Sequence, residues 1–418
     1  MEVATKRRID KWIGIPACAM LSLSRRCFGP RQPRPGPIGK ILIVKLVEQG
    51  STVLAYPALK AAVEMVGRER VFFLAFEENR FILDAMDVIP RENVIPVDAH
   101  SLAATVRSTL AVTKRMRSEG FDAAIDMEFF TRSSAIYTYL SGARLRVGFH
   151  SHAGEGPYRG DLMTHRLLYN PHFHTSQIFL GMVRALRHPA SRSPALGIRP
   201  PALSDLPHPV FTPAASEIEA GRQLIRDLTR SRRTPPLVLV NANCSDILPL
   251  RRWAPENYVA LARRLLDAYP GIVVAFTGAP DEAPHVERLL ARVDSRRTIC
   301  LAGRTTLREL LVLYGLSELL ITNDSGPAHF ATLTPIDVIT LFGPETPRLF
   351  GSTSPRSHLI SAGVFCSPCV SAYSNRFSRC TNNLCMQMIS VDEVFAKARE
   401  ILDRRVGSEV GARAVRSR

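Results

Sequence analysis

Two long series of alternating apolar runs and helix-like segments constrain the fold of this chain most strongly. The first series starts with the apolar run Lys40–Leu46, passes through a glycine-containing turn into a helical pattern, and ends near Phe149. The second starts at Leu237 and closes with a strand, turn, helix and strand pattern over residues 319–343. Continuous apolar strands that alternate with helices are typical of buried parallel sheets. The sequence therefore predicts an α/β protein with two Rossmann-like domains that face a central cleft.

The domain boundaries follow from changes in composition along the 418 residues. A proline- and arginine-rich stretch, Arg199–Pro236, separates the two series and indicates the connection between domains. We therefore expect a basic N-terminal extension (1–37), an N-terminal domain (38–205), a linker region (206–236), a C-terminal domain (237–404) with a cysteine-rich segment (366–385), and a basic tail (405–418).

The net charge of +16 is concentrated at the two ends of the chain. Residues 1–40 hold nine Lys or Arg against two acids, and residues 404–418 hold five Arg against one Glu. These ends therefore carry most of the excess charge, and no aromatic stacking platform accompanies it. This distribution argues against a nucleic-acid-binding protein.

The apolar stretch Trp12–Leu23 lies among the basic residues of the N-terminal extension. It is shorter than the roughly 18 apolar residues that cross a bilayer, and no cleavage site typical of a secretory signal follows it. A basic and apolar segment of this kind can lie on an anionic membrane surface. The alternative is an arm that packs on the folded chain, and the sequence leaves both open.

The turn inside residues 319–343 is rich in groups suited to anions. Ser325 can cap the following helix, Gly326 allows close approach to the backbone, and the N–H groups of a helix start attract negative charge. Taken alone, the turn is more simply explained as an ordinary capped helix start. Other turns of the second series, such as Thr277–Gly278 and Gly303–Arg304, favour a phosphate site because they combine Gly with Thr or Arg.

Two common nucleotide-binding classes lack support. The chain contains neither a P-loop pattern nor a dinucleotide-binding glycine fingerprint, which argues against an NTPase and a dehydrogenase. A two-domain nucleotide-sugar enzyme is the class that remains.

Five histidines crowd the glycine-rich stretch 150–174. Their spacings match no standard zinc pattern. We favour a polar active-site loop over a metal site, and a plain solvent-exposed loop remains an alternative. The histidines are His150, His152, His165, His172 and His174.

Several segments, in sequence order, resemble glycosyltransferase family 9, the lipopolysaccharide heptosyltransferases and their relatives. They include KILIVKL at residue 40, FDAAID at 121, RRWAPENY at 251, FTGAPDE at 276, LAGRTTLREL at 301 and NDSGPAHFA at 323, and the resemblance extends over about residues 38–404. It implies a GT-B fold with an acceptor-binding N-terminal domain and a nucleotide-sugar-binding C-terminal domain. It also implies inverting transfer without a metal, from a nucleotide-diphosphate sugar such as ADP-heptose to a lipid-linked or cell-envelope glycan acceptor. The implied location is cytoplasmic, peripheral on the inner face of the inner membrane.

The resemblance also assigns donor-binding residues. The positions that match the family's donor-diphosphate loop are Asp324, Ser325, Gly326 and His329. Thr277 and Gly278 match a strand-end turn near the nucleotide. Arg251 or Arg252 stands where the family usually has a Lys beside the phosphates.

The chain departs from the family pattern at the acceptor-side base. The family's turn after the first strand ends in Gly-Asp, and that Asp looks like the general base, whereas this chain has Ser51 there. A neutral Ser cannot take a proton without a base of its own. Glu48 and Glu128 are the candidate replacements, and we favour Glu128 because a strand-end side chain points toward the cleft. The alternatives are that both acids only cap or pair with Arg, or that the chain is a non-catalytic nucleotide-sugar-binding pseudoenzyme.

Four cysteines form a C-x2-C-x10-C-x4-C pattern near the C-terminus. One C-x2-C pair can supply two ligands of a structural zinc site, but the second pair has a looser spacing. Structural zinc, reduced thiols and disulfides all remain open, and no cofactor is expected for catalysis itself. The cysteines are Cys366, Cys369, Cys380 and Cys385.

Overall fold

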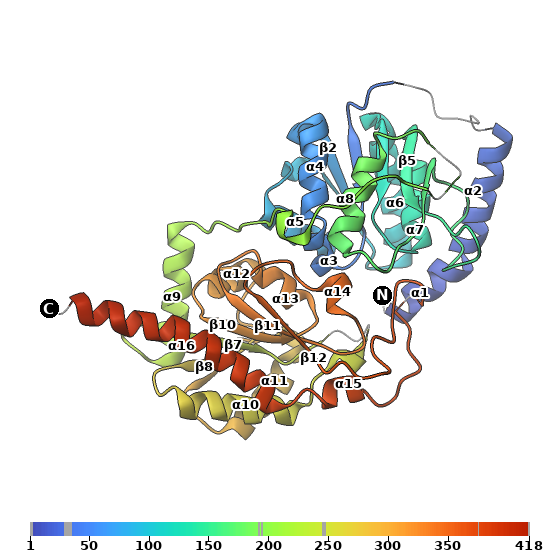
Figure 1. Ribbon diagram of the computed structural model, residues 1–418. Coiled ribbons are helices and arrows are strands. Elements are labelled where there is room, and N and C mark those ends of the chain that lie inside the picture. Colours follow the sequence, from blue (N-terminus) through green and yellow to red (C-terminus); the bar gives the residue numbers. More distant parts are fainter. Residues whose placement is uncertain are drawn as a thin grey trace. The chain divides into compact units, whose positions relative to one another are not determined.

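The computed structural model describes residues 3–28, 36–190, 193, 195–244, 248–374 and 376–416. The chain forms two compact units. Unit 1 comprises residues 1–207 and 370–377, and unit 2 comprises residues 208–369 and 378–418. The short segment Val370–Phe377, here named the strap, thus belongs to unit 1 although its flanking residues belong to unit 2. The predicted α/β class with two Rossmann-like domains is confirmed (Figure 1).

Unit 1 contains a six-stranded parallel sheet in the order β3-β2-β1-β4-β5-β6. The four residues of β1 are all buried, as expected for a central strand with helices on both faces. The sixth strand lies inside the histidine-rich stretch that was expected to be a loop, because three residues are too few to show a strand pattern. The strands are β1 (Ile41–Val44), β2 (Val71–Phe76), β3 (Val94–Val97), β4 (Ala123–Asp126), β5 (Leu145–Phe149) and β6 (His165–Leu167).

Unit 2 repeats this architecture in a second parallel sheet, in the order β12-β11-β10-β7-β8-β9. Numbered within each unit, both sheets have the strand order 3-2-1-4-5-6, which is typical of dinucleotide-binding α/β folds. The strands are β7 (Leu237–Asn241), β8 (Val273–Phe276), β9 (Thr298–Cys300), β10 (Leu319–Asn323), β11 (Asp337–Phe342) and β12 (Ser357–Ser361).

Helices connect the parallel strands and supply the two cores. In unit 1, α6 and α7 share a core with strands β1 to β4. In unit 2, α10, α11 and α16 share a core with β7, β8, β10 and β11 (Figure 1). The last helix, Val391–Arg416, continues past the expected domain boundary at residue 404.

The helices of unit 1 are α1 (Val3–Trp12), α2 (Gly14–Phe28), α3 (Gln49–Leu54), α4 (Tyr56–Val66), α5 (Arg80–Met86), α6 (Leu102–Glu119), α7 (Arg132–Leu140) and α8 (Thr175–Ala185). Those of unit 2 are α9 (Ala215–Thr229), α10 (Pro255–Ala268), α11 (Ala283–Val293), α12 (Leu307–Gly315), α13 (Gly326–Ala331), α14 (Pro347–Phe350), α15 (Leu384–Gln387) and α16 (Val391–Arg416). Short 3-10 turns cover Arg68–Arg70, Glu77–Asn79, Arg91–Asn93, Leu203–Asp205, Pro249–Arg251 and Pro280–Glu282.

Candidate active site

Each sheet has one point where the strand order reverses its direction. This point lies between β1 and β4 in unit 1 and between β7 and β10 in unit 2. Ligands of doubly wound sheets bind beyond the carboxyl ends of the strands at such a point. The predicted acceptor-side residues follow β1 and β4, and the predicted loop of residues 324–329 follows β10. The topology therefore brings the predicted residues of each unit to the edge where a ligand is expected.

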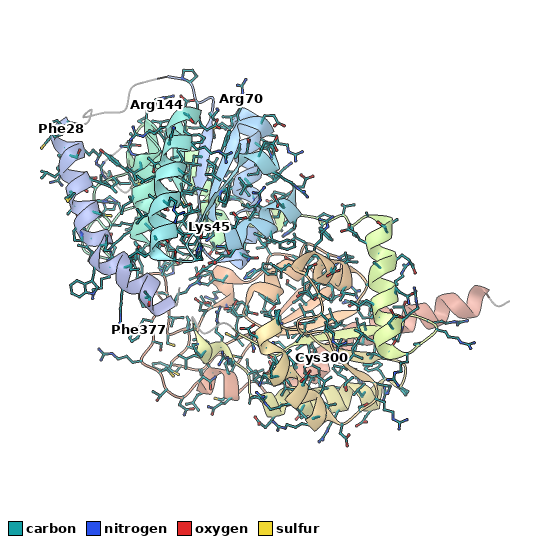
Figure 2. The ribbon with its side chains drawn as sticks, turned by 180° about the vertical axis from the view of Figure 1, so that it is seen from behind. Phe28, Lys45, Arg70, Arg144, Cys300 and Phe377 are labelled. Carbon is teal, nitrogen blue, oxygen red and sulfur yellow. The ribbon has the colours of Figure 1, made fainter. Side chains whose placement is uncertain are left out.

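Glu128 is buried and holds the turn that follows β1. Its Oε1 accepts a hydrogen bond of 2.8 Å from the Val47 N–H and lies 3.7 Å from Nζ of Lys45, whose side chain is fully buried (Figure 2). Lys45 Nζ in turn donates a 2.9 Å hydrogen bond to the Val47 carbonyl. The carboxylate of Glu128 is thus engaged by groups of its own unit. Because the side chain is also only 4% exposed, the arrangement suits a residue that positions the turn better than one that meets a substrate.

Glu48 carries the more accessible of the two candidate carboxylates. Its side chain is 23% exposed, against 4% for Glu128. Ser51 Oγ lies 3.1 Å from Glu48 Oε2 and 3.0 Å from the Glu48 carbonyl oxygen, and its single O–H is shared between these two acceptors. Glu48 Oε1 pairs with Arg376 Nη1 of the strap. The residue in the family's base position is therefore hydrogen-bonded to a carboxylate that the same turn supplies.

Arg376 was missed by sequence reasoning. It lies 328 residues from Glu48 in the chain, in a strap whose described residues form neither a helix nor a strand. Neither a motif nor a periodicity marks such a residue. Only the fold brings it to the first turn of unit 1.

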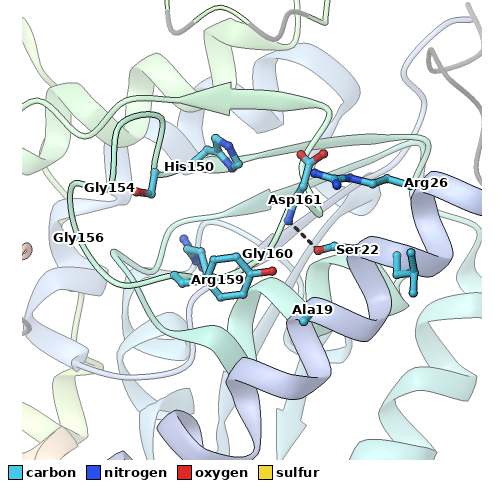
Figure 3. A pocket seen from close by; sticks show the side chains of 12 residues that line it. Ala19, Ser22, Arg26, His150, Gly154, Gly156, Arg159, Gly160 and Asp161 are labelled. Atoms are coloured by element: carbon cyan, nitrogen blue, oxygen red, sulfur yellow. Dashed lines mark hydrogen bonds between the residues drawn. The ribbon is translucent and has the colours of Figure 1, made fainter.

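A pocket of about 490 Å³ lies in unit 1 between α2 and the loop after β5 (Figure 3). Helix α2 approaches the loop closely, since a Cβ on Gly160 would lie 2.6 Å from Ser22 Oγ, and Gly160 also has φ of +75°. Ser22 Oγ accepts a 2.7 Å hydrogen bond from the Asp161 N–H. The pocket has the volume of small-molecule sites, and its lining combines polar side chains with a larger apolar area. The polar side chains belong to Ser22, Arg26, His150, Tyr158, Arg159 and Asp161.

The N-terminal helices are an integral part of unit 1. Asp10 of α1 accepts hydrogen bonds of 3.0 Å from the N–H groups of Arg132 and Ser133, so that it caps the start of α7. The face of α2 that packs on the unit consists of small residues, Gly14, Cys18 and Ser22. The packing arm expected as one alternative is therefore present.

Asn323 organises the strand ends of unit 2. Its Oδ1 accepts hydrogen bonds from the Trp253 N–H at 3.1 Å and from the Tyr258 hydroxyl at 2.9 Å. Its Nδ2 donates to the Asn243 carbonyl at 3.2 Å. One buried amide thus fixes the turns after β7 and β10 relative to each other. Trp253 is 1% exposed, which gives it a packing role.

Thr277 and Gly278 follow β8 and lie beside the same turns. Thr277 Oγ1 accepts a 3.1 Å hydrogen bond from Asn241 Nδ2, and the Thr277 carbonyl accepts one of 3.2 Å from Asn243 Nδ2. A Cβ at position 278 would lie only 2.7 Å from Asn243 Nδ2. A side chain at position 278 would therefore displace the Asn243 amide from the Thr277 carbonyl.

Arg251 lies between two buried carboxylates. Its Nη1 is 3.7 Å from Asp324 Oδ2 and 3.6 Å from Glu345 Oε2. The neighbouring Arg252 is exposed, and its Nη2 donates a 2.9 Å hydrogen bond to the Cys244 carbonyl. Arg251 thus pairs with the loop of residues 324–329 through Asp324. The negative charges of Asp324 and Glu345 compensate its positive charge.

The sequence predicted that the Ser325 side chain caps the helix α13 by hydrogen bonding, and this prediction is wrong. Ser325 does occupy the N-cap position of α13, but its hydroxyl donates to the Asn323 carbonyl at 3.2 Å and makes no cap hydrogen bond. Pro327 removes one N–H of the first turn, and the Ala328 N–H is already bonded to the Ser325 carbonyl. Gly326 starts this six-residue helix, and His329 within it is 8% exposed.

The five histidines of the stretch 150–174 do not all come together in one site. His165 lies in β6 with its Nε2 at 3.0 Å from the His188 carbonyl, and His174 caps α8 by accepting a 3.2 Å hydrogen bond from the Ser176 N–H. Burial lowers the pKa of both His150 and His165. His150 alone of the five lines the pocket beside α2.

The four clustered cysteines form no disulfide. Across the described ranges, no group of three or more His, Cys, Asp or Glu side chains is arranged as a metal site. Cys385 is buried, and burial followed by the charge of the nearby Cys369 raises the pKa of its thiol. The other three thiols are exposed.

Comparisons with known proteins agree with this architecture. Residues 109–377, more than half of the chain, match glycosyltransferase family 9 (heptosyltransferase). Lipopolysaccharide heptosyltransferase 2 of Salmonella typhimurium is 30% identical over 161 residues, which are 38% of this chain and 44% of that protein. The lipopolysaccharide core heptosyltransferase OpsX of Haemophilus influenzae is 23% identical over 65% of this chain and 69% of its own length. The chain thus spans less than half the length of the first curated relatives that it matches.

Solved structures show the same fold. The E. coli ADP-heptose lps heptosyltransferase II superposes with a TM-score of 0.66 and 16% identity, over 88% of this chain and 99% of that one. The E. coli heptosyltransferase WaaC with ADP gives a TM-score of 0.60 at 18% identity, over 86% and 99% of the two chains. The two Rossmann-like units are therefore those of a GT-B fold. Together with the family match, they show that the chain belongs to glycosyltransferase family 9, the heptosyltransferase family.

Proposed function

We propose that this protein is an inverting glycosyltransferase that moves a sugar from a nucleotide-diphosphate donor to a lipid-linked or cell-envelope glycan acceptor without a metal ion. ADP-heptose is the first donor to test, because one solved neighbour of this fold holds ADP-2-deoxy-2-fluoro heptose. The observation that carries the proposal is the Glu48 carboxylate, which Ser51 and Arg376 hold at the reversal point of unit 1. It supplies a base in the turn where the family's Asp is replaced by Ser.

In this mechanism Glu48 takes the proton of the acceptor hydroxyl. The acceptor oxygen attacks the anomeric carbon of the donor sugar as the bond from that carbon to the diphosphate oxygen breaks, and the configuration inverts. The nucleoside diphosphate leaves with the electron pair of that bond. Ser51 orients the carboxylate through its 3.1 Å hydrogen bond and is not itself the base.

On the donor side we assign the residues after β8 and β10 and the two arginines of the turn before α10. Asp324 pairs with Arg251, so its carboxylate suits a hydroxyl of the ribose or the sugar better than a phosphate. The exposed Arg252 is suited to the diphosphate, where its charge stabilises the leaving group. The proposed set is Asp324, Ser325, Gly326, His329, Thr277, Gly278, Arg251 and Arg252.

A second candidate is a nucleotide-sugar-binding protein without transferase activity, and Ser51 in the base position favours it. The two candidates are separated by measuring ADP-heptose binding by calorimetry alongside transfer to heptose-deficient lipopolysaccharide by mass spectrometry. Transfer with inversion supports the enzyme, whereas binding without transfer or donor hydrolysis supports the binding protein.

The outer face of α1 and α2 favours a membrane surface as partner. Trp12, Ile13, Met20 and Leu23 are between 59% and 73% exposed, and Phe28 at the end of α2 is 89% exposed (Figure 2). Exposed large apolar residues beside basic ones are typical of helices that lie in a bilayer interface. Within the part of the chain that is described, none of the helices has the length and apolarity to cross a membrane. Because α2 also lines the 490 Å³ pocket, it could bring the polar part of a lipid-linked acceptor from the membrane to unit 1.

We expect the double variant Met20→Asp and Leu23→Asp to lose at least about 10-fold in affinity for phosphatidylglycerol vesicles, since it places two charges in the interface. Vesicle flotation measures this loss. Val210→Asp, at a position of unit 2 that is 74% exposed, is the matched control and should float like the unchanged protein. Equal flotation of the double variant would contradict membrane binding through α2.

Structural zinc in the cysteine-rich segment stays an open alternative to reduced thiols. Elemental analysis of protein purified without chelators separates the two: about one zinc per chain, lost in Cys366→Ser with Cys369→Ser, would support the zinc site, since the C-x2-C pair would supply two ligands. Cys300→Ser is the control, because Cys300 lies outside the cluster. A metal content near zero in the unchanged protein would leave reduced thiols as the interpretation.

A further inference from the structure

The strap is anchored in unit 1 by an aromatic cluster. The ring of Tyr373 stacks on Phe130 with a centroid distance of 5.5 Å and meets Tyr169 edge-on at 5.1 Å. Its hydroxyl also donates a 2.5 Å hydrogen bond to the Tyr169 carbonyl. Phe130 and Tyr169 come from the loops after β4 and β6. The strap is therefore docked at the carboxyl edge of the first sheet, where the candidate base also lies.

The backbone at both ends of the Glu48–Arg376 ion pair has an unusual conformation. Among the described residues, five other than glycine have φ in the left-handed region. Three of them, Asp87, Arg230 and Asp294, end helices α5, α9 and α11, where this conformation is ordinary. The remaining two are Glu48, with φ of 68°, and Arg376, with φ of 53°. Such conformations persist where the surrounding contacts impose them, and they are frequent at functional sites.

We propose that Arg376 is a positioning residue for the general base, and that the strap completes the acceptor half of the active site. Arg376 holds Oε1 of Glu48 while Ser51 donates to Oε2, so that both oxygens of the carboxylate have fixed partners. This inference rests on the proposed transferase function and assigns a role that no motif of the sequence carries.

The strap also explains how the chain tolerates Ser51. An Asp at that position carries its own charge, whereas Glu48 is longer by one methylene and has more rotamers to lose. Two polar contacts and a docked strap restrict this freedom. Lys45 and Glu128 hold the same turn at Val47 through hydrogen bonds that involve no strap residue.

The test compares Arg376→Met, Arg376→Lys and the control Arg379→Met, an exposed arginine just outside the strap. We expect Arg376→Met to lower kcat on the order of 10- to 100-fold with little change in the KM for ADP-heptose, because misplacing a catalytic group slows the chemical step. Arg376→Lys should recover part of the rate, and Arg379→Met should match the unchanged protein.

Two further outcomes decide the inference. In a Glu48→Gln background, Arg376→Met should cause no additional loss of rate; an equal loss in both backgrounds, or a faster Arg376→Met enzyme, overturns it. If the unchanged protein transfers no sugar, the proposed function fails, and hydrogen exchange then tests the strap alone. Arg376→Met should speed exchange in both the strap and residues 47–51, and exchange like that of Arg379→Met would overturn the docking role.

Discussion

Glu48→Gln is expected to lower kcat for sugar transfer by about 10²- to 10⁴-fold, which is the contribution of a well-placed general base. Gln keeps the length and hydrogen-bonding capacity of the side chain but cannot accept the proton. The affinity for ADP-heptose should not change, because the assigned donor residues belong to unit 2. Steady-state transfer rates together with calorimetric titration of ADP-heptose measure the two quantities separately.

The control for Glu48→Gln restores a carboxylate at position 51, where the family has its Asp. Adding Ser51→Asp to the Glu48→Gln variant puts a carboxylate at the family's position, and transfer should rise at least about 10-fold above that of Glu48→Gln alone. A Glu48→Gln enzyme that keeps the full rate would rule out Glu48 as the base. A Ser51→Asp addition with no effect would show that position 51 does not face the acceptor.

The fold was predictable because its signals are local and repeated. Apolar runs such as Lys40–Leu46 and Leu319–Thr322 are long enough to identify buried parallel strands from their composition alone. β6 has only three residues and lies among histidines and glycines, so no such signal marks it. The order of the strands then follows from a common α/β topology, which places both candidate sites at the reversal points.

The contacts of the two acids could not be predicted from strand position. Glu128 was favoured because it follows a strand end, yet its carboxylate contacts Lys45 and the Val47 N–H inside the unit. Glu48 was the less favoured acid, yet it meets Ser51 and Arg376. Such outcomes depend on which charged side chains the fold brings together. The Arg376 contact spans 328 residues, a separation over which a single sequence gives no pairing information.

Lys45→Met is expected to lower the stability of unit 1 by about 3–5 kcal/mol, because it leaves the carboxylate of Glu128 buried without its cation. The side chains of Lys45 and Glu128 are 0% and 4% exposed, so water cannot replace the lost partner. Since the chain has two units, a single unfolding midpoint would mix their stabilities. Native-state hydrogen exchange resolves them: the amides of β1 should exchange faster by about two to four orders of magnitude, and those of β7 should not change.

The double variant Lys45→Met and Glu128→Gln separates loss of charge pairing from loss of packing. Replacing both partners removes the uncompensated charge, so much of the protection of β1 should return, whereas a packing defect at position 45 would persist in both variants. Lys40→Met is the matched control, because Lys40 pairs with Glu119 in a site where both side chains are about 30% exposed, and it should cost less than about 1 kcal/mol. Unchanged protection of β1 in Lys45→Met would contradict a structural role for the Lys45–Glu128 pair. Glu128 would then again be a candidate for the base, because its carboxylate would not be needed to hold the turn after β1.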